Sequence, residues 1–233
     1  MSRNVRPCPY VGDNYASCGK VMIIGDSHYT KSELTDKGIK KFTIGMIKKV
    51  SSAENTGYFK RIHEFMKYLD WGYAKCGIED FFDNIIFYNY FDYFVCCRRK
   101  DPRKINNNSR DSAKTFVELV KKHEPKIIIC FSKRAYSCMP GEKRLKEIQM
   151  DCEEKTLSYD SLKNIQSSEE RKQKKSRGSF CTYTIENGSK QEIQVFGLLH
   201  LTGAWGNSGP AAYDGEDTLE ILKENLQMVE ENQ

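Results

Sequence analysis

A short apolar run that ends in glycine constrains this chain more than any other feature. Residues Lys20 to Tyr29 read KVMIIGDSHY, in which four consecutive apolar residues precede Gly25. An apolar run of this length, closed by glycine, is typical of a strand buried on both faces of a parallel sheet. In open α/β sheets, ligands bind beyond the carboxyl ends of such strands, so the side chains after Gly25 are candidates for a functional site. Glycine, aspartate and serine are also common turn residues, which would explain the same letters without a site.

Three further runs predict strands that also end in polar or aromatic side chains. Ile85 to Phe87 leads into the sequence YNYFD, and Lys126 to Phe131 (KIIICF) leads into Ser132. Glu192 to Leu199 runs directly into His200. The last of these strands pairs in a predicted hairpin with 180–185, because Asn-Gly lies between the two arms and is a strong hairpin signal.

Helical periodicity separates these runs. Apolar residues recur at helical spacing within 57–70, 113–120 and 219–229, and a short helix is expected near 44–50. We expect Ser109 to cap the 113–120 helix, and Ser132 to cap a further helix. Strands that alternate with helices, with one late hairpin, predict an α/β fold: a three-layer α/β/α sandwich around a mainly parallel central sheet.

We expect 1–233 to form a single domain with a charged insertion at about 151–178, where apolar periodicity is lost and the sequence becomes rich in lysine and glutamate. That insertion is expected to be partly helical or mobile, and it offers a second basic surface for nucleic acid.

Composition excludes several classes of protein. No apolar run approaches the roughly 18 residues of a membrane span, and the first residues lack the apolar core of a signal peptide. The nine cysteines contain no CxxC pair. We therefore expect a cytoplasmic monomer that has no membrane partner, keeps its thiols reduced, and uses no cofactor and no metal.

The formal net charge of +5 is a mild excess, but part of it is clustered. The stretch CCRRKDPRK places Arg98, Arg99, Lys100, Arg103 and Lys104 close together after the second strand. Such a cluster is often only a solvated loop. Beside a site at the strand ends, it would instead contact phosphates of a nucleic acid.

The strand ends, in this order, resemble those of the uracil-DNA glycosylase superfamily. Gly25-Asp26-Ser27-His28-Tyr29 takes the place of that family's first motif, of the type GQDPYH or GEAPG. Asn89 takes the place of the asparagine that reads the base edge, and Lys126 to Phe131 the place of the third strand. His200-Leu201-Thr202 takes the place of the motif that begins with histidine. The resemblance covers most of the chain through motif order and strand context.

The resemblance implies a DNA glycosylase that hydrolyses the N-glycosidic bond of a flipped-out pyrimidine and leaves an abasic site. Asp26 matches the acidic residue of the GEAPG type, so we expect Asp26 and His200 to be catalytic. The base pocket would be formed by Ser27, His28, Tyr29, Asn89, Tyr90 and Thr202. DNA would be bound by Arg98, Arg99, Lys100, Arg103, Lys133, Arg134 and Trp205.

Three positions depart from the family pattern. Ser27 stands where the GQDPYH type has its aspartate, His28 replaces a proline, and Leu201 replaces the proline after the final histidine. These departures favour a modified base, such as a 5-substituted or glucosylated cytosine of phage DNA, over strict specificity for uracil. An anti-phage role would follow from such a substrate.

Two other classes of function stay open. Gly25-Asp26-Ser27 is similar to the nucleophile block of SGNH-type esterases, although Gly197 stands where that class has an aspartate three residues before its histidine. The second is a DNA-binding module that keeps the fold but has lost catalysis. Ser27 stands in the family's aspartate position and cannot act as a carboxylate, which is consistent with that loss.

Overall fold

The computed structural model describes residues 7–30, 35–51, 57–96, 109–140, 156–160, 179–186, 190–201 and 217–232. The strands are β1 (Tyr10–Val11), β2 (Val21–Thr30), β3 (Ile85–Cys96), β4 (Ile127–Cys130), β5 (Thr156–Asp160), β6 (Ser179–Glu186) and β7 (Lys190–Gly197). The helices are α1 (Asp36–Lys40), α2 (Phe42–Ser51), α3 (Gly57–Tyr68), α4 (Ile78–Asp83), α5 (Ser109–His123), α6 (Lys133–Cys138) and α9 (Asp217–Glu231), with short 3-10 turns at Tyr15–Ser17 and Gly72–Ala74.

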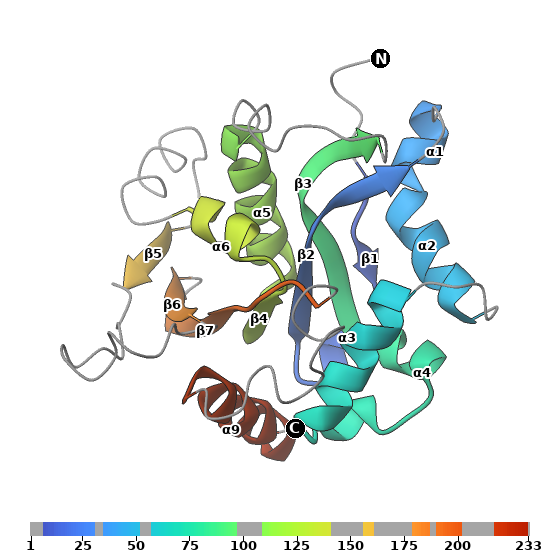
Figure 1. Cartoon of the computed structure of the whole chain (residues 1–233). Coiled ribbons are helices and arrows are strands. Elements are labelled where there is room, and N and C mark those ends of the chain that lie inside the picture. Colours follow the sequence, from blue (N-terminus) through green and yellow to red (C-terminus); the bar gives the residue numbers. More distant parts are fainter. Residues whose placement is uncertain are drawn as a thin grey trace, which may run out of the picture.

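The described strands form one seven-stranded sheet in the order β1-β3-β2-β4-β7-β6-β5 (Figure 1). The neighbours β3, β2, β4 and β7 run parallel to one another, whereas β1 pairs antiparallel with β3, β6 with β7, and β5 with β6. The four parallel strands are the four that the apolar runs predict. The pairing of β6 with β7 confirms the predicted hairpin, whose turn at 187–189 lies outside the described residues.

The alternation of side chains along β2 explains why its apolar run is unbroken. Val21 and Ile23 pack in a core with residues of α2, α3, α4 and α9, whereas Met22 and Ile24 pack in a second core with residues of α5 and α6. Because helices cover both faces of the sheet, consecutive residues are all buried. The fold is therefore α/β with a mixed sheet that is parallel at its centre, and it is compatible with the expected three-layer sandwich (Figure 1).

The two strands that carry the first motifs are longer than predicted. We expected β2 to end at Gly25 and β3 near Phe87, but β2 continues to Thr30 and β3 to Cys96. The neighbour β4 ends at Cys130, opposite Ile24. Beyond Ile24, β2 therefore pairs with β3 alone among the described strands, and the two curve away together (Figure 1). Their register shifts between Ser27 and His28, which is the signature of a β-bulge.

The remaining elements mostly follow the periodicity. The predicted helices near 44–50, at 57–70, at 113–120 and at 219–229 correspond to α2, α3, α5 and α9. Within the predicted insertion at 151–178, the structure describes only β5, a strand that was not expected and that pairs with β6; the rest of that segment lies outside the described residues. The short elements β1, α1 and α4 were not predicted, because two to six residues are too few to show a period.

Candidate functional site

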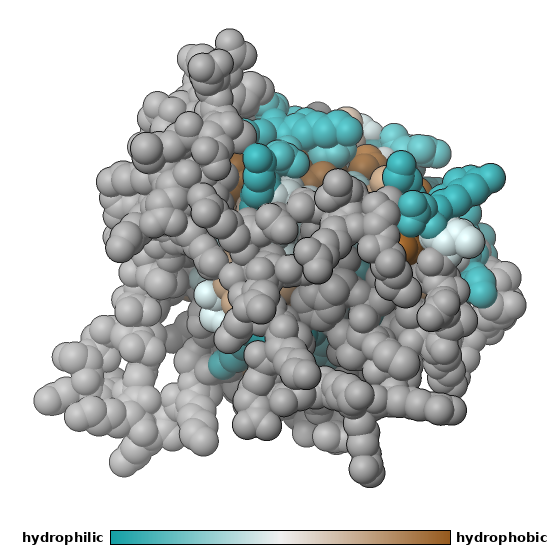
Figure 2. Space-filling view, turned by 90° about the horizontal axis from the view of Figure 1, so that it is seen from above, coloured by the Kyte–Doolittle hydropathy of each residue, from teal (hydrophilic) through white to brown (hydrophobic). Residues whose placement is uncertain are grey.

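A cavity of about 290 Å³ lies beside the extensions of β2 and β3, under α2 and α3. Its apolar wall is formed by Phe42, Met46, Tyr58, Phe59 and Phe87. Its polar groups are Asp26, Ser27, His28, Thr43, Asn89 and His200. An apolar cavity with a few converging polar groups is the usual form of a small-molecule site, and this volume is at the lower end of the roughly 300–1,000 Å³ common for such sites. Figure 2 views the side of the molecule toward which β2 and β3 run, where hydrophobic residues show between hydrophilic ones.

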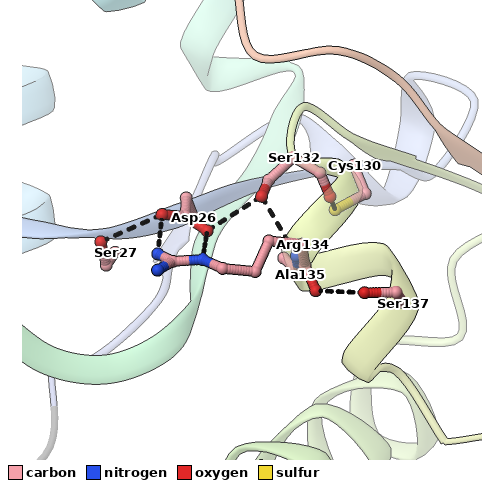
Figure 3. Close-up of polar contacts among 7 residues, drawn as sticks. All are labelled: Asp26, Ser27, Cys130, Ser132, Arg134, Ala135 and Ser137. Carbon is pink, nitrogen blue, oxygen red and sulfur yellow. Dashed lines mark hydrogen bonds and ion pairs between the residues drawn. The ribbon is translucent and has the colours of Figure 1, made fainter. Parts of the chain in front are cut away.

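The carboxylate of Asp26 is the most densely bonded group of the site (Figure 3). Its Oδ1 accepts hydrogen bonds from Ser132 Oγ at 2.9 Å and from Arg134 Nε at 3.0 Å. Its Oδ2 accepts from Arg134 Nη2 and, at 3.3 Å, from Ser27 Oγ. Two parallel N–H donors make the ion pair with Arg134 bidentate, which fixes the plane and the direction of the carboxylate.

The end of β4 supplies the partners of Asp26. Ser132 follows that strand and caps α6, because its Oγ accepts from the backbone N–H of Ala135 at 3.1 Å, as predicted. The first turn of α6 carries Arg134, whose guanidinium also lies over the ring of Phe91 at 4.9 Å. We predicted Arg134 as a DNA-binding residue. The structure shows its guanidinium paired with the carboxylate of Asp26, while 34% of its side chain stays exposed.

A second polar pair joins β2 and β3. Asn89 Nδ2 lies 3.1 Å from His28 Nδ1, and both side chains are buried. Asn89 approaches β2 closely because it is the cross-strand partner of Gly25. A Cβ atom at Gly25 would lie 2.1 Å from Asn89 Oδ1, so only glycine leaves room for the amide. Gly25, which closes the apolar run, is therefore needed to admit the side chain of Asn89.

The imidazole of His28 is neutral at physiological pH. It is 3% exposed, and its burial lowers its pKa to about 4 from 6.5. Its ring also packs edge-to-face against Phe42, with the centroids 5.5 Å apart. A neutral imidazole can accept a hydrogen bond at one nitrogen and donate from the other.

His200 reaches the cavity from the segment after β7. Its ring stacks on Tyr58 of α3, with the centroids 5.0 Å apart and the planes 18° from parallel. Burial lowers the pKa of His200, the charge of Asp26 raises it, and the charges of Arg134 and Arg61 lower it. The Tyr58 ring thus packs on one face of the His200 imidazole. The charge of that imidazole depends on the carboxylate of Asp26 and the guanidinium of Arg134, which also belong to the site.

The structure brings together five predicted site residues: Asp26, Ser27, His28, Asn89 and His200. It does not bring Tyr90 to them. Tyr90 follows Asn89 on a continuing strand and so points to the opposite face, where its hydroxyl donates to the carbonyl of Cys138 at 2.6 Å. Its predicted place in the base pocket is therefore wrong.

The other predicted contacts are only partly described. Lys133 is exposed at the start of α6. The side chain of Tyr29 lies outside the described residues, as do Thr202, Arg98, Arg99, Lys100, Arg103 and Trp205.

The sequence did not predict the roof of the cavity. Phe42, Thr43 and Met46 come from α2, and Tyr58 from α3. The helical periodicity of α3 marked its apolar residues as core. No motif distinguished Tyr58 or Thr43 as neighbours of the strand ends.

No protein-family model matches this sequence, and no curated protein matches it either. Within the described ranges, no three His, Cys, Asp or Glu residues are grouped so that they could hold a metal ion. The helices described are also too short or too polar to cross a membrane.

Proposed function

We propose that this chain is a DNA glycosylase of the uracil-DNA glycosylase type, acting on a flipped-out pyrimidine. The observation that carries the proposal is convergence: Asp26 from β2, Asn89 from β3 and His200 after β7 line one cavity. They come from three of the four parallel strands, and the third predicted motif strand, β4, leads into the residues that hold Asp26. A uracil-DNA-glycosylase-like fold is part of the same proposal.

The proposed chemistry assigns the sugar to Asp26. Cleavage of an N-glycosidic bond develops positive charge on the sugar and negative charge on the leaving base. A fixed carboxylate stabilises the former and orients the attacking water, as carboxylates do in glycosidases. Asp26 is suited to this task because four hydrogen bonds from three side chains define its direction.

The proposed base site is the apolar part of the cavity. A base must leave the duplex to be attacked, and it is then held between apolar faces and read by hydrogen bonds to its edge. Tyr58, Phe59 and Phe87 supply the faces. Asn89 supplies the amide, and His200 is positioned to donate to the departing base. Uracil and 5-substituted or glucosylated cytosines are the proposed substrates, and a role against phage DNA would follow from the latter.

The decisive experiment is alkali-induced strand cleavage, because excision of a base leaves an alkali-labile abasic site. The wild type is compared with Asp26→Asn on three DNAs: uracil-containing, unmodified and carrying heavily modified phage cytosines. We expect the wild type to generate cleavage on one of them and Asp26→Asn to lose at least about 100-fold in rate.

Asp36→Asn is the matched control, since Asp36 is an exposed aspartate in the first turn of α1. It should retain the wild-type rate. Equal cleavage by the wild type and Asp26→Asn, or no cleavage of any of the three DNAs, would count against the proposed activity.

One observation favours a second candidate, a DNA-binding module without catalysis. Arg134 engages both oxygens of Asp26, which leaves the carboxylate less available to a substrate. In that case the protein would bind DNA without generating alkali-labile sites. The esterase alternative gains no support, because within the described residues the Ser27 hydroxyl bonds to Asp26 and not to a histidine base.

A further inference from the structure

The contact between His28 and Asn89 has a consequence for what the cavity can bind. An amide nitrogen only donates hydrogen bonds, so at 3.1 Å from Asn89 Nδ2 the Nδ1 atom of His28 must be the acceptor. A neutral imidazole that accepts at Nδ1 carries its proton on Nε2. Burial thus accounts for the neutral form of His28, and the contact with Asn89 Nδ2 selects this tautomer.

The same contact determines which atom of the Asn89 amide is already hydrogen-bonded within the protein. With Nδ2 on His28, Asn89 Oδ1 lies against Gly25 and accepts no hydrogen bond from the described residues. Asn89 is 9% exposed and lines the cavity. Because this oxygen has no donor among the described residues, a ligand in the cavity that brings an N–H to it gains a hydrogen bond there.

Reversal of the amide would reverse this preference. If His28 carried its proton on Nδ1, Asn89 would turn its oxygen to His28 and its NH₂ group toward the ligand. The cavity would then favour a ligand acceptor. The tautomer of His28 thus decides whether a donor or an acceptor is read.

We propose that His28 is a positioning residue that fixes the Asn89 amide, so that the cavity selects planar heterocycles that present an N–H donor. This rests on the proposed function in taking the ligand to be a pyrimidine. It goes beyond that function in assigning the selectivity to a histidine on β2 rather than to Asn89 alone.

The first test is the tautomer itself. Nitrogen-15 NMR of the ring-labelled protein, with His28 assigned through its loss in His28→Phe, should show an unprotonated Nδ1 and a protonated Nε2 at pH 7. Protonation at Nδ1 would overturn the proposal, whatever the enzymatic activity turns out to be.

The second test uses two probes that differ by one methyl group, 1-methyluracil and 1,3-dimethyluracil. The second probe lacks the N–H donor. By titration calorimetry, the wild type should bind 1-methyluracil about tenfold or more tightly than 1,3-dimethyluracil. His28→Phe keeps a flat ring against Phe42 but removes the acceptor, so the ratio should fall to about threefold or less.

His28→Gln restores an acceptor to Asn89 and should recover most of the ratio, which a purely structural role of His28 would not do. An unchanged ratio in His28→Phe, or no binding of either heterocycle, would overturn the proposal. Selective binding without DNA cleavage would uphold it while removing the proposed glycosylase activity.

Discussion

Arg134 Nε donates to Asp26 Oδ1 at 3.0 Å, across 108 residues of sequence. The contact exists because β4 lies beside β2 and ends at the level of Ile24. The chain then turns through Ser132 into α6, at the level where β2 continues through Asp26 beyond its last partner on β4. The ion pair therefore links the first motif of the chain to α6, the helix that follows β4, and Arg134 holds the proposed catalytic carboxylate without lining the cavity itself.

Arg134→Gln should destabilise the protein. Removing one partner of a fully buried ion pair is unfavourable by about 3–5 kcal/mol. We expect about 2 kcal/mol here, because the Arg134 side chain is 34% exposed while that of Asp26 is 10% exposed. Urea denaturation measures the change in the free energy of unfolding. Lys133→Gln is the matched control on the exposed neighbour and should stay within about 0.5 kcal/mol of wild type. Equal effects of the two substitutions would show that the ion pair does not stabilise the folded protein.

Gly25→Ala should damage the site more than the fold. The new methyl group would lie 2.1 Å from Asn89 Oδ1 and 3.1 Å from Phe87 Cζ, so the amide must move. We expect at least about a tenfold loss of affinity for 1-methyluracil, with a destabilisation of about 1–3 kcal/mol from overpacking. Calorimetric titration and thermal unfolding measure the two effects.

Gly45→Ala is the control for this substitution, since nothing lies within 4 Å of the added methyl group. Gly45 is inside α2, where alanine is favoured over glycine by about 0.5–1 kcal/mol. This variant should be more stable than wild type and bind equally well. Retained affinity in Gly25→Ala would show that Asn89 does not need its present position.

The sheet could be predicted because burial on both faces makes its parallel strands continuous apolar runs. Ile23 and Ile24 point to opposite faces, yet both are 0% exposed. Apolar residues at consecutive positions therefore indicate a strand that lies between two layers. The ends of β2 and β3 could not be predicted in the same way. Beyond Gly25, β2 pairs with one neighbour among the described strands and carries polar side chains, so the composition there resembles that of a turn.

The error at Tyr90 follows from the missed extension of β3. Had the strand been continued through position 90, alternation would have placed Asn89 and Tyr90 on opposite faces. The pairing of Asp26 with Arg134, and the position of Thr43 over the cavity, depend on contacts between distant segments. No local pattern in a single sequence encodes those contacts.

Stability should depend on pH through His28. The unfolded chain binds a proton on this residue near pH 6.5, whereas the folded protein does so only near pH 4. Between these values the unfolded state holds more protons, so the contribution of His28 is complete above pH 6.5 and is lost as the pH falls toward 4. The loss is on the order of 3 kcal/mol. Urea denaturation at pH 7.5 and 4.5 should show it.

His28→Phe isolates this term from the other groups near the cavity. The burial of His200 and His123 also lowers their pKa values, and both histidines remain in the variant. Asp26 and Arg134, which belong to the same site, are unchanged as well. The difference in stability between the two pH values should therefore shrink in His28→Phe without vanishing. An identical difference in both proteins would mean that His28 is not buried as a neutral group.

Thr43→Val should separate ligand binding from stability. Thr43 is 2% exposed and lines the cavity from α2, and within the described residues its hydroxyl makes no hydrogen bond. Replacing the hydroxyl of this cavity-lining residue by a methyl group of similar shape should leave the free energy of unfolding unchanged or raise it by up to about 1 kcal/mol. If the hydroxyl instead serves a ligand, affinity for 1-methyluracil should fall about three- to tenfold. Thr218→Val, at a buried threonine of α9 away from the cavity, should leave that affinity unchanged. A loss of stability with unchanged affinity in Thr43→Val would show that the hydroxyl supports the fold. Unchanged stability with reduced affinity, which we expect, would place α2 in the binding site together with β2 and β3.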